Sequence, residues 1–218
     1  MVKYTPAETS EWVADNLRKS KDVSKVEVLS DQVLRETRSK YDPFVAGIVS
    51  AKCVEADTVR TLVKSKLGVE IIANVPKDSY WTGGALRLAH DNNIATGAYG
   101  DLLRVIDLQD VRAFQPKETE FVERGLRQHD RISSFERVYD RLYRISRNGL
   151  PDLTVAMLNE YELTADHLRT ARDWYGKFSV AVITNPNGRA TSSAEEAAGS
   201  MGVEILKWRP FFGRLNKK

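Results

Sequence analysis

The sequence has little of what a secreted, membrane-spanning or zinc-binding protein would show. Cys53 is the only cysteine among 218 residues, so the chain forms no internal disulfide and suits a reducing compartment. No segment approaches the ~20 consecutive apolar residues of a membrane-spanning helix, and the N-terminal stretch has no apolar segment like that of a signal peptide. His90, His129 and His167 are scattered and give no zinc-ligand spacing. We therefore expect a soluble, cytoplasmic protein without a membrane partner.

Motifs that dictate a reaction are also missing. The sequence contains neither a serine nucleophile elbow nor a glycine-rich phosphate loop. The net charge of +3 permits a nucleic-acid partner without requiring one. A hydrophobic content of 42% is enough to bury a core, in one large domain or in two small ones. The composition predicts a globular protein and names no activity.

A comparison of the sequence with itself predicts an internal duplication. When the chain is shifted by half its length, it aligns end to end without a gap, and 17 of 109 positions are identical. We call this displacement the half-chain shift. Hydropathy agrees in the same register: Ile48 falls on Met157, and Tyr99 falls on Trp208. We therefore expect two diverged copies of one fold, residues 1–109 and 110–218.

Each copy reads as a helix, three strands, a second helix, a strand, a third helix and a strand. In the first copy the helices are expected over 7–19, 57–68 and 85–93, and the strands over 25–29, 33–39, 44–51, 69–76 and 94–98. The strand 44–51 is apolar on both faces, which is typical of a sheet covered on each side. In the second copy, residues 135–147 fit a helical period as well as two strands, and the first copy favours two strands. The order predicts an α/β fold with a mixed sheet.

This order of elements resembles the core of the PD-(D/E)XK restriction-endonuclease-like superfamily. The segment 183–208 is similar to the C-terminal part of type IV restriction enzymes: a strand ends in a small polar turn, and a threonine precedes a helix with alanines four residues apart. Those residues are Thr191, Ala194 and Ala198, and the first copy keeps Thr82, Ala85 and Ala89. The resemblance implies a pseudo-two-fold pair of nuclease-like repeats.

The superfamily's chemistry requires an aspartate on the second strand and an acid-x-lysine motif on the third, which together hold a divalent metal and activate water. If the hairpin of the first copy turns near residues 40–43, and that of the second copy at the equivalent position, Asp31 lies across from Lys52, and Asp140 lies across from Tyr161, next to Glu160. Asp31, Lys52, Asp140 and Glu160 are therefore the candidate catalytic residues. Neither copy has the full set, and aspartates in tight turns commonly bond their own backbone instead. We expect no bound metal, with Mg²⁺ or Mn²⁺ required only if a composite nuclease site survives.

Arginines are concentrated between residues 124 and 147. Arginine forks suit phosphate oxygens, although such a run also fits a solvated, salt-bridged surface. The pairs Arg35/Arg144 and Arg38/Arg147 recur in both copies, as a two-fold binder of DNA would require. The candidate nucleic-acid-binding residues are Arg35, Arg38, Arg137, Arg141, Arg144 and Arg147.

Three functions remain open from the sequence. The first is a nucleic-acid-associated pseudoenzyme, a DNA-binding or assembly subunit in bacterial defence or DNA processing, whose metal sites are eroded in both copies. The second is an active metal-dependent endonuclease with a composite site. The third is a pseudo-symmetric module that binds a protein or a small ligand. The chain is expected to be a monomer with an internal two-fold or a homodimer, with protein partners an open question.

Overall fold

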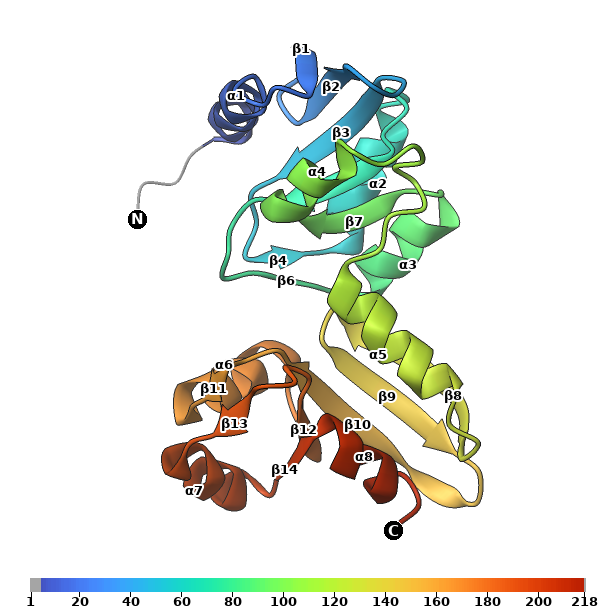
Figure 1. Cartoon of the computed structure of the whole chain (residues 1–218), viewed down its shortest axis with the longest axis vertical. Helices are drawn as coiled ribbons and strands as arrows, with labels where there is room; N and C mark the ends of the chain where they lie inside the picture. The colour runs from blue at the N-terminus through green and yellow to red at the C-terminus, as the bar shows by residue number, and fades with distance from the viewer. Residues whose placement is uncertain (1–4, 218) are drawn as a thin grey trace. The chain divides into compact units, whose positions relative to one another are not determined.

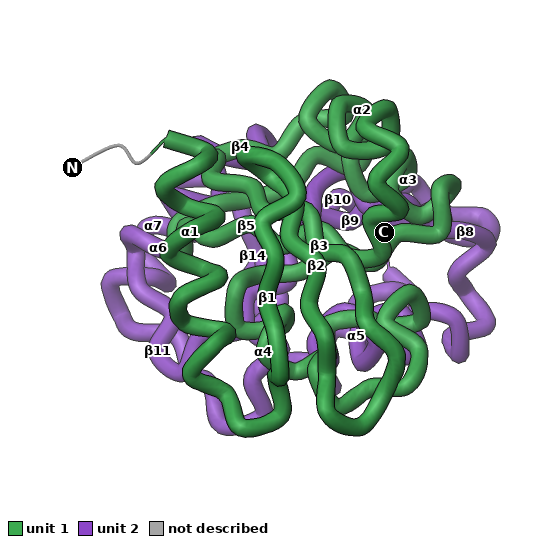
Figure 2. The backbone as a smooth tube through the Cα atoms, turned by 90° about the horizontal axis from the view of Figure 1, so that it is seen from above, with its two compact units in different colours: residues 1–116 green, residues 117–218 purple. Residues whose placement is uncertain are grey.

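The computed structural model describes residues 5–217, which form two compact units divided between Pro116 and Lys117. We call them unit 1 and unit 2. Figure 1 shows the elements of each unit, and Figure 2 distinguishes the units by colour. The division falls after Pro116, because the segment before it belongs to unit 1. Val111 is buried in the unit 1 core, and Arg112 donates to the carbonyl oxygen of Asn93 at 2.8 Å.

Unit 1 contains a five-stranded mixed sheet in the order β1-β2-β3-β5-β7. The first three strands, β1 (Val23–Ser30), β2 (Val33–Arg38) and β3 (Phe44–Val49), form an antiparallel meander. The strands β5 (Ile71–Asn74) and β7 (Ala95–Ala98) then continue the sheet in parallel with β3. The α/β class and the mixed sheet predicted from the sequence are confirmed.

Helices cover both faces of the unit 1 sheet. Buried residues of α1 (Pro6–Leu17) and α4 (Tyr99–Val105) share one core with the sheet, and those of α2 (Ala56–Lys64) and α3 (Gly83–Asp91) share another. All six residues of β3 are buried, as expected for a strand covered on both sides. Short strands that the sequence did not predict, β4 (Cys53–Val54) and β6 (Tyr80–Trp81), pair beside α2 and α3.

Unit 2 has a five-stranded sheet in the order β14-β12-β10-β9-β8. Its antiparallel strands are β8 (Ile132–Tyr139), β9 (Leu142–Arg147) and β10 (Leu150–Leu158), so residues 135–147 lie within two strands, as predicted. The strands β12 (Val180–Ile183) and β14 (Glu204–Lys207) follow in parallel with β10. The helices are α5 (Lys117–Arg127), α6 (Ala165–Tyr175), α7 (Ser192–Met201) and α8 (Trp208–Arg214), and the short pair is β11 (Glu162–Leu163) and β13 (Arg189–Ala190).

The bounds of the strands recur along the chain with a constant spacing. β1 and β8 begin at Val23 and Ile132, and β2 and β9 end at Arg38 and Arg147, in each case separated by the half-chain shift. The same spacing separates both ends of β5 from those of β12, both ends of β7 from those of β14, and both ends of α4 from those of α8.

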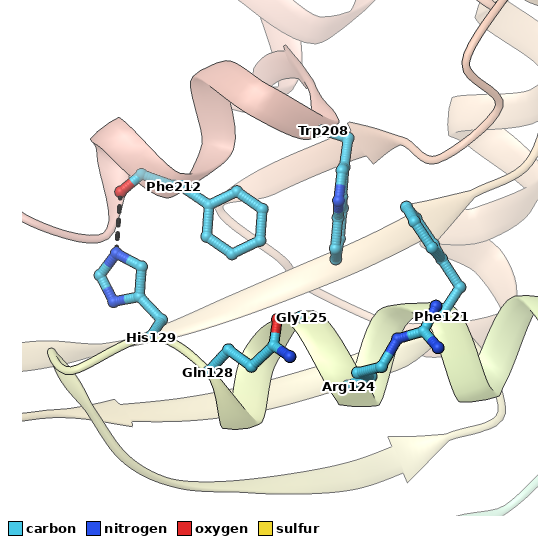
Figure 3. Close-up of a pocket in the computed structure, with 7 residues that line it drawn as sticks. All are labelled: Phe121, Arg124, Gly125, Gln128, His129, Trp208 and Phe212. Atoms are coloured by element: carbon cyan, nitrogen blue, oxygen red, sulfur yellow. Dashed lines mark hydrogen bonds between the residues drawn. The ribbon is translucent and has the colours of Figure 1, made fainter.

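Gly125 allows α5 and α8 to approach closely (Figure 3). A Cβ at this position would lie 2.5 Å from Cζ2 of Trp208. We expect Gly125→Ala to lower the free energy of unfolding of unit 2 by about 1–3 kcal/mol, because overpacking outweighs the gain in helix propensity. Gly199→Ala on α7 is the matched control: nothing lies within 4 Å of its Cβ position, so it should add about 0.5–1 kcal/mol. Denaturant titration of both variants measures the difference, and an equal gain in both would contradict the close approach.

Candidate functional site

Polar side chains gather at the end of the unit 2 sheet where the parallel strands β10 and β12 finish. Carboxyl ends of parallel strands meet at one edge, which is where α/β folds commonly place functional groups. The β8–β9 turn and the first residues of α5 reach the same edge, because β9 pairs antiparallel with β10. We call this group the polar cluster, and its members are Glu118, Asp140, Arg141, Glu160, Tyr175 and Thr184.

Glu118 joins the first helix of unit 2 to the end of β12. Its Oε1 accepts a hydrogen bond from Oγ1 of Thr184 at 2.9 Å, and its Oε2 lies 4.0 Å from Nη2 of Arg141. Thr184 is buried, which holds Glu118 against the edge of the sheet. Both carboxylate oxygens of Glu118 therefore already have partners within the chain.

Asp140 is held by its own turn and by α6. Its Oδ1 accepts from the backbone N–H of Arg141 at 3.1 Å and from the hydroxyl of Tyr175 at 3.3 Å. Burial raises the pKa of Tyr175, and the charge of Asp140 raises it further, so the phenol remains a donor at neutral pH. Asp140 is thus both the turn aspartate expected from the sequence and a member of the polar cluster.

Arg141 supplies the positive charge of the polar cluster. Desolvation lowers the pKa of its guanidinium, but the surrounding charges, with Glu118 and Asp140 the strongest, outweigh desolvation and raise it. Glu160 contributes to the same field. The arrangement is one guanidinium among three acidic side chains, so acids outnumber bases in the polar cluster.

Glu160 faces a histidine that the sequence analysis left without a role. Its Oε2 lies 3.8 Å from Nε2 of His167. Nδ1 of His167 accepts from the backbone N–H of Thr164 at 3.2 Å, which orients the ring at the start of α6. This bond places the proton of a neutral His167 on Nε2, toward Glu160.

The acids of the polar cluster do not fit the metal site of the restriction-endonuclease-like superfamily. A divalent metal requires several oxygens that converge on one point, yet Glu118 binds Thr184, and Asp140 binds Tyr175. No group of three or more histidine, cysteine, aspartate or glutamate side chains suited to a metal ion occurs within residues 5–217.

At the corresponding edge of unit 1, the side chain of an asparagine bonds to the backbone beyond the neighbouring strand. Asn74, at the end of β5, is buried; its Nδ2 donates to the carbonyl oxygen of Ala51 at 2.8 Å, and its Oδ1 accepts from the backbone N–H of Ala51 at 3.1 Å. Lys52 is exposed just beyond this bridge, and Asp31 is exposed in the β1–β2 turn, where its carbonyl oxygen accepts from Oγ of Ser10 at 2.7 Å. These candidates are not joined into one site.

The strand register corrects the expected partners of both aspartates. Val33 lies opposite Gly47, so the direction of the hairpin brings Asp31 level with the end of β3, short of Lys52. In unit 2, Ala156 lies opposite Leu142, which brings Asp140 level with the last residue of β10, short of Tyr161. The tighter hairpins bring the two turn aspartates level with residues 49 and 158, three positions earlier than the expected 52 and 161.

Two of the six predicted nucleic-acid-binding arginines are structural. Arg38 is 6% exposed, and Arg147 is 5% exposed. Their guanidinium groups donate to backbone carbonyls, including Val105 at 3.1 Å for Arg38 and Leu215 at 3.2 Å for Arg147. The prediction for these two is corrected, since neither can reach a phosphate while it holds these carbonyls.

The other four arginines differ in their exposure. Arg137 is half-buried between Glu123, 3.9 Å away, and the ring of Tyr143. Arg35 and Arg144 are exposed on the antiparallel strands, where each lies opposite a glutamate, Glu27 and Glu136 respectively. Arg141 is exposed at the polar cluster.

Glu118, Tyr175 and Thr184 are the members of the polar cluster that sequence reasoning missed. The comparison of the two halves carried a signal, because the half-chain shift pairs these positions with Thr9, Lys66 and Val75. Only Thr184 falls on an apolar residue, Val75, so it alone was a polar residue present in one half only. Their convergence could not be predicted, since residues 118 and 184 meet only through the sheet.

The observed fold and site define a two-unit, mixed-sheet α/β protein with a charged cluster at one sheet edge. No family model matches the chain, and no significant match was found among curated proteins or solved structures. Within residues 5–217, no helix combines the length and apolar character needed to cross a membrane.

Proposed function

We propose that the chain consists of two diverged nuclease-like repeats and acts as a non-catalytic, nucleic-acid-associated subunit. The constant half-chain shift supports the duplication: it relates the bounds of corresponding strands and also the buried arginines Arg38 and Arg147, which hold equivalent carbonyls. Agreement in the strand bounds and in a buried contact is stronger support for a duplication than an alignment of the two half-sequences alone.

The strand order of each unit supports the nuclease-like part of the proposal. A helix, an antiparallel meander and a helix crossing over to a parallel strand are the elements that the resemblance implies. Both sheets have this order, with β3 and β10 as the strands where the meander becomes parallel. Fold alone does not determine function. The proposal therefore depends on the side chains at the edge where the parallel strands end.

The observation that carries the non-catalytic part is the engagement of the acids at that edge. In unit 2, Arg141 lies among the carboxylates of Glu118, Asp140 and Glu160. In unit 1, Ala51 stands where unit 2 has Glu160, and Asn74 bridges its backbone. Arg141 and the hydroxyl donors already engage carboxylate oxygens that Mg²⁺ would need, which disfavours a metal site at this edge.

Nucleic acid is the proposed partner because exposed arginines recur on equivalent strands. Arg35 and Arg144 occupy the same position of β2 and β9, and both are solvent-exposed. Arg144 lies 3.8 Å from its cross-strand glutamate, Glu136, whereas Glu27, opposite Arg35, pairs with Lys25 at 2.8 Å. An exposed guanidinium of this kind suits the oxygens of a backbone phosphate.

Fluorescence anisotropy with labelled duplex and single-stranded DNA tests the proposal. We expect binding that weakens as salt is raised, since each phosphate contact releases counterions. Arg144→Glu should weaken binding about tenfold and reduce the magnitude of the slope of log K against log salt by about 1. Arg169→Glu is the matched control, because Arg169 is an exposed arginine on α6 in a surface pair with Asp166. Binding that is absent, or equally sensitive to both variants, would contradict the nucleic-acid assignment and favour a protein or small-ligand partner.

An active nuclease with a composite site is the competing function. The observation in its favour is that Asp140 and Glu160 share the field of Arg141 at one sheet edge. Supercoiled and linear DNA incubated with Mg²⁺ or Mn²⁺ should remain intact if the proposal is correct. Cleavage that Glu160→Ala abolishes would establish the nuclease and refute the non-catalytic assignment.

A further inference from the structure

Each unit exposes an aromatic pair on its first helix and on its last helix. In unit 1, Trp12 is 46% exposed, and its ring centroid lies 5.1 Å from that of Tyr99. In unit 2, Phe121 is 37% exposed, and its centroid lies 4.8 Å from that of Trp208. Exposed clusters of large apolar side chains commonly mark interaction surfaces.

The two surfaces are built from equivalent positions. We define the Trp12 patch as Trp12, Tyr99 and Leu103, and the Phe121 patch as Phe121, Trp208 and Phe212; the half-chain shift carries each member of the first onto its counterpart in the second. Leu103 is exposed like Trp12. The Phe121 patch opens into a groove of about 370 Å³ between α5 and α8, into which the rings of Trp208 and Phe212 face (Figure 3). The groove has room for an aromatic side chain.

Charge reverses between the two patches at the flanking positions. Trp12 is preceded by Glu8 and followed by Asp15, at helical spacings of four and three residues. Phe121 has Lys117 and Arg124 at the same two spacings, so both acids become bases. Arg209 on α8 adds a third exposed base.

The remaining charges near the patches do not reverse this pattern. Beside the exposed ring α1 also carries Glu11, and α5 carries Glu118, Glu120 and Glu123. Two of these are engaged elsewhere: Glu118 accepts from Thr184, and Glu123 pairs with Arg127. Asp15 pairs with Arg18 at 2.8 Å, and Arg124 lies 4.0 Å from Glu120. These are surface pairs, which contribute little and exchange readily for an intermolecular partner. Arg104, next to Leu103, is paired with Asp101. The flanking positions of Trp12 are therefore acidic, and those of Phe121 are basic.

We propose that the Trp12 patch of one copy docks on the Phe121 patch of a second copy of this chain. The protruding indole would enter the groove between α5 and α8, and Asp15 would face Arg124. Because the two surfaces differ, the contact is heterologous, and it builds a ring or an open chain instead of a symmetric dimer. This self-association is independent of the proposed nucleic-acid function.

Sedimentation velocity over a range of protein concentrations tests the self-association. The mean mass of the native chain should rise with concentration, and less steeply in high salt. Asp15→Arg and Arg124→Asp should each weaken association about tenfold, because like charges then meet. Mixing the two variants in equal amounts should restore association, since every contact between different variants pairs opposite charges.

Asp166→Arg is the matched control, because Asp166 forms an exposed ion pair with Arg169 at the same three-residue spacing. It should leave association unchanged. Trp12→Ser, which removes the ring without altering charge, should abolish association. A chain that stays monomeric at every concentration, association that only one of the two charge reversals weakens, or a mixture that stays dissociated would overturn the proposal. Circular dichroism of each variant verifies that it is folded.

Discussion

Raising the pH from 5 to 8 is expected to destabilise unit 1 by about 3 kcal/mol through one side chain, Glu36. This residue is fully buried in β2, and neither carboxyl oxygen has a hydrogen-bond partner among the described residues. Burial raises the pKa of Glu36 from 4.5 to about 7, and the charge of Arg38 only partly opposes this. The carboxyl group is therefore protonated in the folded chain at mildly acidic pH.

The direction of the pH dependence follows from the two protonation states. Below a pH of about 4.5 the carboxyl group is protonated in both the folded and the unfolded chain, so its titration does not change the free energy of unfolding. Between 4.5 and 7 only the unfolded chain releases the proton, and folding loses about 1.4 kcal/mol for each pH unit. Above 7 the loss is complete at about 3 kcal/mol, and it stays constant.

Two substitutions isolate this contribution. Glu36→Gln should remove the pH dependence, because the amide does not titrate. Glu36→Ile should also raise the free energy of unfolding at pH 8, by about 1–3 kcal/mol, since it replaces an unpartnered polar group with an apolar one. Unit 2 already has a buried isoleucine, Ile145, at the position that the half-chain shift pairs with Glu36.

Hydrogen exchange of the β1–β3 amides across this pH range reports the stability of unit 1 separately from that of unit 2. After correction for intrinsic exchange rates, the native chain should lose protection from pH 5 to 8, while Glu36→Gln stays level. Equal losses in the two proteins would mean that Glu36 is not the titrating group.

The secondary structure was predictable because its signals are local. A run such as residues 44–49 is apolar at every position, and its burial on both faces follows directly from that. The ambiguous segment 135–147 was resolved by comparison with the first half of the chain, and it forms β8 and β9. The pairs β4–β6 and β11–β13 were not predictable, since strands of two residues carry no periodicity.

The candidate site was only partly predictable, because its contacts are long-range. Asp140 and Glu160 were identified from the sequence and lie near Arg141, but Glu118 and Thr184 are 66 positions apart and meet only in the folded sheet. The burial of the arginines, in contrast, follows from a local pattern. Alternation along β2 places Leu34, Glu36 and Arg38 on one face, so the burial of Arg38 could have been read from period 2.

Arg38→Met is expected to lower the free energy of unfolding of unit 1 by about 3–5 kcal/mol. The guanidinium joins the end of β2 to the last turn of α4, where Nη1 donates to the carbonyl oxygens of Val105 at 3.1 Å and Leu108 at 2.5 Å. Nε donates to the carbonyl oxygen of Asp42 at 2.8 Å. A methionine fills similar space but leaves these carbonyls without donors, and each buried, unsatisfied group costs about 1–3 kcal/mol.

Arg147 makes the equivalent contacts in unit 2. Its Nη1 donates to the carbonyl oxygens of Leu215 at 3.2 Å and Lys217 at 2.7 Å, and its Nε donates to that of Pro151 at 2.9 Å. Arg147→Met should therefore destabilise unit 2 by a similar amount. Arg38→Lys and Arg147→Lys should recover only part of the loss, because an ammonium group lacks the planar fork that reaches several carbonyls at once.

The matched controls are the arginines three positions earlier on the same strands. Arg35 and Arg144 are exposed, so Arg35→Met and Arg144→Met should change the free energy of unfolding by less than about 0.5 kcal/mol. Denaturant titration of the whole chain, with hydrogen exchange to assign each loss to its unit, measures both pairs. If Arg38→Met were as mild as Arg35→Met, the tie between β2 and α4 would contribute no stability. A severe effect would explain why an arginine stands at this position in both halves without any need for a phosphate contact.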